Sequence, residues 1–519
     1  MNVMIASKKI THRFFKSYFL FILLIATLAN GNASANTSLF KTESLQALID
    51  VATKNKTTLV LKTNSQYLVS KPLRITCSIE GNGATVTVNS DAVVGVEISS
   101  NNLVINSLNI SGARLKMIDL KANNVTISRC HFSTKSYFVL LRIGGHNTKL
   151  LNSTLENYYK SRFQYAIKSQ DKIPINGLVV ENCKIYGGVY MENLTKNKYG
   201  GYSFRENSFE VNYSHAVQNI NNQHDGFRFA GIDGITFLDN IINFKDVNRG
   251  FKFTDAEAGL KGRTQSNNPT TNILFSGNKI TSVSKNGKQL FDFYDGTAIA
   301  SISNNIISSK GHTTIFEDKT TMSLPSSRKL IVSKNKIYFD FRICYYRGAT
   351  KKTQLKNNVS ISFIDNDFFY TGNVQASSKI QRSGSNKDFK LEYLIYVRSL
   401  NNFEFVSNRL NTDSPANSFS NSRVIFINDV SKSNVENNKI SGGISFQKEG
   451  VNDDLRFVNN TIDEISLPTV IDLKSSQKNI KLDNHISFEG NQVKMKSKNI
   501  KIINSSSEST MMKANKISY

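Results

Sequence analysis

Short segments in which apolar and polar residues alternate recur along most of the chain. An alternation with a period of two is typical of a β-strand that buries one face, and the Asn, Gly, Ser and Asp residues around each segment favour turns. No stretch between the segments keeps a helical period, so the pattern predicts strands without alternating helices. The clearest copies are Phe204-Arg-Glu-Asn207-Ser-Phe209, Phe237-Leu-Asp-Asn240-Ile-Ile242 and Phe275-Ser-Gly-Asn278-Lys-Ile280.

These segments share the template apolar-x-x-Asn-x-apolar, which indicates a solenoid. One strand of this length cannot bury its own face, so successive copies must stack. Each Asn can then hydrogen-bond to the equivalent Asn one coil away, which pairs polar groups inside the turn. Cys130 and Cys183 take the Asn position in two earlier copies, about two coils apart, and are expected to be buried free thiols. The template Asn residues are Asn207, Asn240, Asn278, Asn305, Asn335, Asn366, Asn408, Asn438, Asn460 and Asn491.

With this Asn ladder, the opening of the chain resembles the right-handed parallel β-helix of the pectate-lyase-like superfamily. The opening contains the segments Leu45-Gln-Ala-Leu48-Ile49, Leu59-Val60-Leu61, Tyr67-Leu-Val69 and Ile79-Glu-Gly81. In that superfamily such a block forms a capping helix, a first strand and the entry to the solenoid. The resemblance covers about residues 40–505 and implies an all-β fold, a single right-handed parallel β-helix. It leaves the activity open, because the superfamily includes lyases, glycosidases, epimerases and phage tailspikes.

The first 35 residues have the layout of a secretory signal peptide. Four basic residues precede an apolar run at 18–29, and small residues follow at 32–35 in an A-x-A pattern. The run is shorter than the roughly 20 residues that span a bilayer, which argues against a stable membrane span. We therefore expect cleavage after about Ala35 and a periplasmic or secreted protein. The expected organisation is a signal peptide at 1–35, an N-terminal cap and first strand at 36–70, the β-helix at 71–505 and a C-terminal tail at 506–519.

The charge balance narrows the class of partner. The chain of 519 residues has 65 Lys and Arg against 40 Asp and Glu, a formal net charge of +25. Such a surplus favours polyanionic partners. Because export argues against nucleic acid, an acidic polysaccharide is the expected partner. The absence of Trp excludes a tryptophan-based sugar platform, and four Cys exclude a disulfide scaffold.

A second strand precedes each Asn strand and places a charged residue or a tyrosine between apolar neighbours. If the neighbours point into the solenoid, the central residue points out, and stacking aligns these residues in one outward file. Long insertions at 256–271 and 319–328 lie beside the middle copies, and long loops on a solenoid often form its binding face. The alternative is a solvated face whose charges prevent aggregation. The file is expected to contain Glu97, Asp119, Arg142, Lys168, Arg228, Lys252, Asp292, Glu317, Tyr346 and Tyr396.

The middle of this file could support β-elimination on a uronate. That reaction needs a cation to neutralise the carboxylate and a base to remove the C5 proton. Arg228 and Lys252 could divide these roles, and Asp292 and Glu317 complete the predicted catalytic set. Lyases of the resembled superfamily commonly use Lys or Arg, sometimes with calcium held by carboxylates, here Asp255, Glu257 and Asp295 together with Asp292. The predicted substrate-binding residues are His224, Asp225, Arg249, Arg263, Tyr346 and Tyr396.

Two other functions stay open at this point. A tailspike-type glycoside hydrolase would use paired carboxylates among Asp292, Asp295, Glu317 and Asp318. A non-catalytic protein of capsule or exopolysaccharide production would bind its polymer along the whole file. An enzyme should show polar groups that converge at one place, and a binder should show an even strip.

Overall fold

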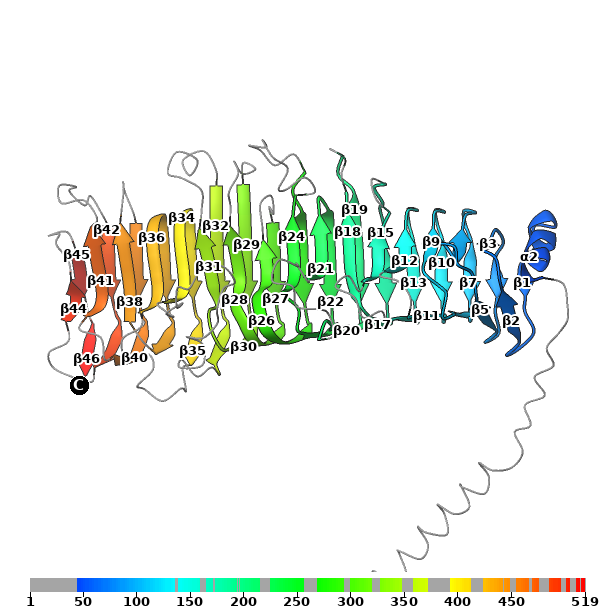
Figure 1. The fold of residues 1–519 in the computed structure, drawn as a ribbon. Helices are drawn as coiled ribbons and strands as arrows, with labels where there is room; N and C mark the ends of the chain where they lie inside the picture. Colours follow the sequence, from blue (N-terminus) through cyan, green and yellow to red (C-terminus); the bar gives the residue numbers. More distant parts are fainter. Residues whose placement is uncertain are drawn as a thin grey trace, which may run out of the picture. The chain divides into compact units, whose positions relative to one another are not determined.

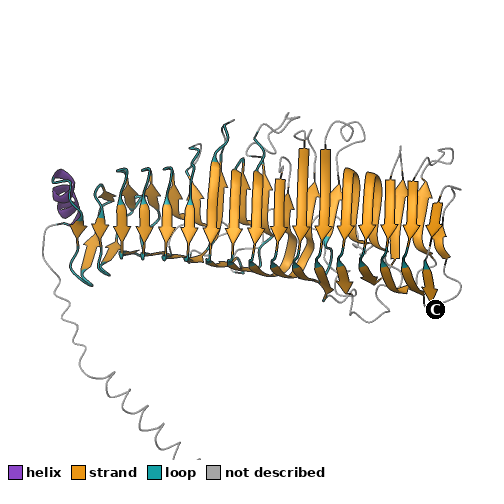
Figure 2. Cartoon of the chain, turned by 180° about the vertical axis from the view of Figure 1, so that it is seen from behind, coloured by secondary structure: helices purple, strands orange, loops and turns teal. Residues whose placement is uncertain are grey.

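The computed structural model describes residues 44–135, 139–158, 165–170, 173–193, 195, 197–214, 225–255, 268–293, 299–319, 327–347, 358–371, 393–411, 423–441, 443–448, 454–465, 469–475, 485–495, 501–504, 510–513 and 515–518. Within these ranges the chain forms one helix, α2 (Leu45–Lys54), and 46 strands. Every strand pairs in parallel with strands one coil away, as the row of arrows in Figures 1 and 2 shows. The predicted all-β parallel β-helix is confirmed.

The strands fall into three columns, and each coil passes through the first, second and third in turn. The first column contains β3 (Leu73–Ile75), β6 (Val96–Ile98), β9 (Ile118–Leu120), β12 (Val139–Ile143), β15 (Tyr165–Ser169), β18 (Gly188–Glu192), β21 (Asp225–Ala230), β24 (Arg249–Thr254), β26 (Lys279–Phe293), β28 (Ile306–Lys319), β31 (Cys344–Arg347), β34 (Tyr393–Val406), β36 (Arg423–Glu436), β38 (Gly443–Lys448), β41 (Thr469–Ser475) and β44 (Lys501–Asn504). The second contains β1 (Leu59–Val60), β4 (Ile79–Glu80), β7 (Val104–Asn106), β10 (Thr126–Ser128), β13 (Lys149–Leu151), β16 (Val179–Glu181), β19 (Gly200–Arg205), β22 (Asp233–Leu238), β25 (Thr271–Ser276), β27 (Ile299–Ser303), β29 (Ser327–Ser333), β32 (Asn358–Ile364), β39 (Asp454–Val458), β42 (His485–Glu489) and β45 (Thr510–Lys513). The third contains β2 (Gln66–Val69), β5 (Thr85–Val88), β8 (Asn109–Ser111), β11 (His131–Thr134), β14 (Thr154–Asn157), β17 (Lys184–Tyr186), β20 (Ser208–Asn212), β23 (Ile241–Lys245), β30 (Lys336–Phe339), β33 (Asp367–Tyr370), β35 (Arg409–Asn411), β37 (Lys439–Ser441), β40 (Thr461–Ile465), β43 (Gln492–Met495) and β46 (Lys516–Ser518). The long strands β26 and β28 run from the third column into the first, and β34 and β36 run from the first into the second.

The Asn ladder lies at the tight turn between the second and third columns. The turn takes two residues, of which the first has a positive φ, as at Asp239 (54°), and the second is the ladder residue. Asn240 donates from Nδ2 to Asn278 Oδ1 at 2.9 Å and to the Phe204 carbonyl at 3.0 Å. All ten predicted Asn residues take part, and the ladder continues to Asn515, which the template did not include. All four cysteines are free and buried, as expected for Cys130 and Cys183.

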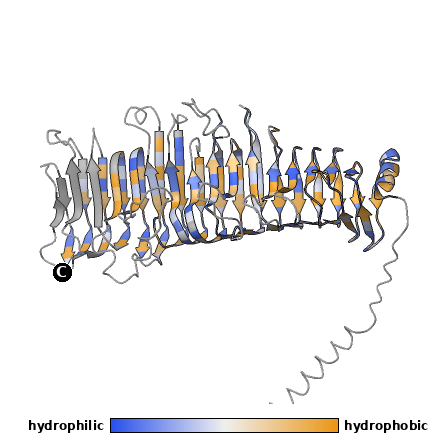
Figure 3. Ribbon diagram, in the orientation of Figure 1, coloured by the Kyte–Doolittle hydropathy of each residue, from blue (hydrophilic) through white to orange (hydrophobic). Residues whose placement is uncertain are grey.

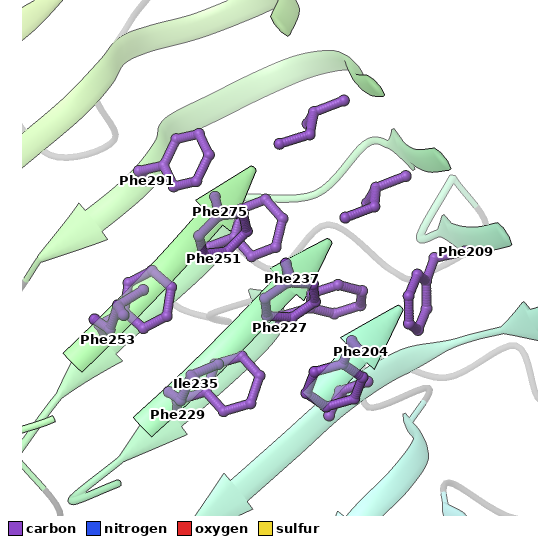
Figure 4. Close-up of a cluster of buried hydrophobic side chains, with 14 of the residues drawn as sticks. Phe204, Phe209, Phe227, Phe229, Ile235, Phe237, Phe251, Phe253, Phe275 and Phe291 are labelled. Atoms are coloured by element: carbon purple, nitrogen blue, oxygen red, sulfur yellow. The ribbon is translucent and has the colours of Figure 1, made fainter. Parts of the chain in front are cut away.

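Phenylalanine fills the solenoid interior in the middle coils. Rings on successive coils stack, with centroids 4.6 Å apart for Phe237 and Phe275 and 4.9 Å apart for Phe251 and Phe291. Figure 4 shows this cluster, and the alternating colours along the strands in Figure 3 show the polar residues between apolar ones. Each buried ring contributes about 1.5–3 kcal/mol through the hydrophobic effect. The Phe-x-Phe pattern therefore fixes which side of these strands faces inward.

The two ends of the described solenoid differ from each other. At the start, α2 buries Leu45, Ile49 and Ala52, and Ser44 caps it by accepting a hydrogen bond from the Ala47 amide. At the other end, β45 and β46 pair with β42 and β43, so the stack extends past residue 505 into the segment predicted as a tail. The predicted signal peptide, 1–35, lies outside the described residues. Within the described residues, no helix has the length and apolar character needed to cross a membrane.

Candidate active site

The outward residues of the first column align in register, one per coil. Arg228 is opposite Lys252, Lys252 is opposite Asp292, and Asp292 is opposite Glu317. We call these four residues the charge row. Their neighbours Phe227, Phe251 and Phe291 are completely buried on the inner side. The structure thus brings together the four residues that the sequence pattern placed in one file.

A second outward row runs beside the charge row, three residues earlier in each strand: Asp225, Arg249, Gln289 and Thr314. Simple alternation does not predict it, because an odd spacing should turn these side chains inward. The alternation is interrupted between the two rows. Leu290 is completely buried there, and a Cβ placed on Gly226 would lie 2.4 Å from the buried Phe244 ring. Two consecutive positions therefore face inward, and both rows face outward.

The predicted exposure of the charge row is wrong for three of its members. Lys252 is 8% exposed, Asp292 3% and Glu317 1%. In this part of the column Arg249 lies between acids of the two rows. Long connections border this part of the column: the chain needs residues 255–270 to pass from β24 to β25 and 213–224 to pass from β20 to β21.

Arg249 ties the two rows together. Its Nη1 donates to Asp225 Oδ1 at 3.1 Å, and its Nε forms an ion pair with Asp292 Oδ2 at 2.7 Å. Both carboxylates are almost fully buried, which requires a cation between them. Asp225 and Arg249, predicted to bind substrate, are therefore paired with each other. Arg249 connects acids on the coils before and after its own, so its ion pairs span three consecutive coils.

The two central groups of the charge row have shifted pKa values. Burial, together with the cations Arg249 and Arg228, lowers the pKa of Lys252 to about 8 against the opposing effect of Asp225 and Asp292. Burial and the neighbouring Glu317 raise the pKa of Asp292 to about 6, although Arg249 and Lys252 act in the opposite direction. Both groups therefore change protonation near neutral pH, which is typical of functional sites.

Arg228 lies at the N-terminal edge of this cluster, next to an aromatic residue of the same file. Its Cζ is 5.0 Å from the ring centroid of Tyr190, and Lys168 Nζ is 5.4 Å from the same ring. The Nε of Arg228 is buried and has no hydrogen-bond partner among the described residues. Tyr190 was missed because the pattern sought a charge and placed this coil near Glu192. The triplet Val189-Tyr190-Met191 carries the same apolar-x-apolar signal.

Tyr346 does not belong to the outward file. It is 1% exposed and faces inward, where burial raises its pKa. Tyr345 takes the file position, opposite Glu317 on one side and Tyr396 on the other. The triplet was misassigned because two adjacent tyrosines leave the alternation ambiguous. Asp318, a candidate for the hydrolase pair, is also buried and forms an ion pair with Arg328 at 2.8 Å.

Four predicted site residues lie outside the described residues: His224, Arg263, Glu257 and Asp295. Of the proposed calcium ligands, Asp255 is buried and accepts a hydrogen bond from the Asn268 amide at 3.3 Å, and Asp292 is paired with Arg249. No group of three His, Cys, Asp or Glu residues that could hold a metal ion occurs in the described part of the chain. These residues by themselves do not form a calcium site.

Comparison with known proteins does not identify an activity for this chain. No protein-family model matches the chain, and no curated protein matches it. One similar solved structure is described as a new PL6 alginate lyase complex with trisaccharide. The two chains are 12% identical with a TM-score of 0.31, and the match covers 91% of this chain and 87% of that one. A likeness this distant says nothing about individual site residues.

Proposed function

We propose that this protein cleaves an acidic polysaccharide by β-elimination, at the outward face of β21, β24, β26 and β28. The observation that carries the proposal is the placement of a buried lysine, Lys252, in register between a partly exposed arginine, Arg228, and a buried carboxylate, Asp292. Ionisable groups converge on these four coils, which is the arrangement expected of an enzyme rather than of an even binding strip.

The reaction assigns a separate role to each group. Arg228 binds the uronate carboxylate and disperses the negative charge that develops when the C5 proton leaves. The uncharged amine of Lys252 takes that proton, and its pKa of about 8 leaves a useful uncharged fraction near neutral pH. The C5–H electron pair forms the C4–C5 double bond, the C4–O4 bond breaks, and O4 takes up a proton. Glu317, the next member of the row, is the candidate proton donor, and Asp292 stays a carboxylate paired with Arg249.

A hydrolase is the second candidate, favoured by one observation. Asp292 and Glu317 are opposite each other on adjacent strands, about 5 Å apart in the backbone. Retaining glycosidases use two neighbouring carboxyl groups, about 5 Å apart. Elimination is preferred because Arg228 and Lys252, in register in the same row, would have no role in hydrolysis by a carboxyl pair.

Calcium binding stays a prediction and has no role in the reaction steps above. Of its proposed ligands, Glu257 and Asp295 lie outside the described residues, and Asp292 is already paired with Arg249. If bound by Asp255, Glu257 and Asp295, calcium would neutralise the substrate carboxylate.

The test is incubation of the purified protein with a panel of uronate-containing and neutral polysaccharides. Ultraviolet absorbance of an unsaturated product indicates elimination, and new reducing ends without that absorbance indicate hydrolysis. Lys252→Met should abolish the reaction, whereas Lys121→Met, directly after β9 of the first column, should not. If no polymer of the panel is cleaved but some are bound, the protein is the non-catalytic binder.

We also propose that the protein is exported. Its support is the basic, apolar and small-residue order of the first 35 residues. Mass spectrometry of the N-terminus of the protein recovered outside the cytoplasm should find Asn36 first; an intact N-terminus would contradict export by cleavage.

A further inference from the structure

The outward file changes character immediately after Glu317. The next three members are Tyr345, Tyr396 and Phe426, in register on β31, β34 and β36. Their rings stack, with centroids 4.9 Å and 5.0 Å apart and interplanar angles of 17° and 10°. Tyr393 adds a fourth ring, 4.5 Å from Phe426. We call these four residues the aromatic strip; its three tyrosines are partly exposed.

Arginines lie on both sides of the aromatic strip. The guanidinium of Arg342 is 5.1 Å from the Tyr345 ring centroid, and its Nε donates to the Tyr393 carbonyl at 3.3 Å. Arg398 follows Tyr396 by two residues and therefore points outward as well, because the intervening Val397 is fully buried. Both arginines are partly exposed. The strip thus combines an apolar surface with cations at its borders.

Stacked outward rings are not confined to the aromatic strip. The third column carries a similar outward pair on neighbouring coils, Tyr338 and Phe369, with centroids 4.8 Å apart at 16°. What distinguishes the strip is its continuity with the charge row, since Tyr345 is directly opposite Glu317. A polymer lying along the first column over Lys252 would reach the strip without changing direction.

We propose that the aromatic strip, with Arg342 and Arg398, binds a second acidic sugar residue of the same polysaccharide chain. This inference rests on the proposed function. Successive coils are about 4.8 Å apart, so Tyr345 and Tyr396 lie roughly 14 and 19 Å along the solenoid from Lys252. The C–H groups of the sugar contact the exposed ring edges of the strip, the phenol hydroxyls hydrogen-bond to its hydroxyls, and an arginine pairs with its carboxylate. The polysaccharide therefore runs parallel to the solenoid axis, and short oligosaccharides bound over Lys252 do not reach the strip.

The test is affinity electrophoresis in gels that contain polygalacturonate, polymannuronate or hyaluronan, with dextran as the uncharged control. Tyr396→Ala and Arg342→Gln should each weaken binding of at least one acidic polymer by about 5- to 10-fold. The matched control Tyr338→Ala removes an equivalent stacked ring from the third column and should change binding by less than about twofold. As competitors, uronate trisaccharides should displace the wild type and Tyr396→Ala equally well, whereas octasaccharides should displace the wild type better.

The outcomes separate this inference from the proposed function. If Arg228→Ala weakens binding but Tyr396→Ala and Arg342→Gln behave like Tyr338→Ala, the strip only stabilises the fold and the inference is overturned, while the proposed function stands. If the strip variants weaken binding and no polymer is cleaved, the strip is a saccharide site on a non-catalytic protein. If none of the three acidic polymers retards the wild type, both proposals fail.

Discussion

The outward file of the first column carries charges in two regions, β6–β12 and β21–β28, which use the same strand geometry differently. In the first region each charge is paired with an opposite one. Arg142 donates from Nε and Nη2 to both carboxylate oxygens of Asp119 at 2.9 and 2.7 Å, and Lys121 pairs with Glu97 at 3.2 Å. Like charges are neighbours in both regions, Glu97 beside Asp119 in the first and Arg228 beside Lys252 and Asp292 beside Glu317 in the second, but in the second three of the four are buried.

The charges of the two regions affect the stability of the fold in opposite ways. A bidentate pair between adjacent coils satisfies the buried Asp119 and stabilises the stack. A buried lysine whose pKa is lowered to about 8 opposes folding while it is charged, by roughly 3 kcal/mol at a pH well below that value. The ion pairs of Arg249 with Asp225 and Asp292 offset part of the free-energy cost of burying these two carboxylates. Stability does not explain three buried charges in one row, one of them a lysine with a lowered pKa, and this supports a site at β21–β28.

The largest expected effect is on activity. Lys252→Met removes the proposed base and should lower the rate of product formation by about 10²- to 10⁴-fold, because this is the usual contribution of a general base. The matched change Lys121→Met, in the paired region, should leave the rate within about twofold. The measurement is the initial rate on the polymer that the panel identifies. Equal rates for the two variants would mean that the charge row is only a protein surface.

The second effect is on stability, and it runs in the opposite direction. Arg142→Met leaves the fully buried Asp119 without its bidentate partner and should cost about 3 kcal/mol, whereas Lys252→Met should cost less than about 1 kcal/mol or stabilise. Hydrogen exchange of the amides in β9–β15 and in β21–β28 measures the two losses locally, which suits a solenoid in which each coil contacts only its neighbours. A larger loss of protection for Lys252→Met would contradict the contrast between the regions.

The third effect is on pH dependence. Only the uncharged form of Lys252 accepts a proton, so activity should rise with pH and level off above about 8. Arg249 lowers the pKa of Lys252, so Arg249→Gln should raise that pKa and move the rising limb to higher pH by about one unit. Arg249→Lys keeps the positive charge and should shift the limb less. Profiles of kcat/KM for the three proteins give the comparison; a shift toward lower pH in Arg249→Gln would show that Lys252 is not the base.

The smallest expected effect follows removal of divalent ions. Because Asp292 is held by Arg249 and Asp255 by the Asn268 amide, chelation should change the rate by less than about twofold. Rates before and after dialysis against a chelator, with calcium added back, measure this. A large loss that calcium restores would instead support a metal site that includes Glu257 and Asp295.

Local sequence determined the fold because its signals repeat. The apolar-x-apolar alternation sets the inner face of the strands, and the Asn at the second-to-third-column turn from Asn207 onward sets where the coils stack. Both signals act within a few residues, so a pattern identifies them without knowledge of distant contacts. The same alternation placed Arg228, Lys252, Asp292 and Glu317 in one file, which the register confirms.

Only the tertiary structure decided which of these residues form a buried cluster. The interrupted alternation at Gly226 and Leu290 turns Asp225 and Arg249 outward, and Arg249 then contacts acids on the coils before and after its own. Such contacts join residues 24 or more positions apart, and no local pattern encodes them. The sequence prediction placed Tyr346 in the outward file, where the structure has Tyr345, for a related reason. A shift of one residue reverses the face of a strand, and the alternation pattern fits either of two adjacent tyrosines equally well. The register with Glu317 identifies Tyr345 as the outward residue.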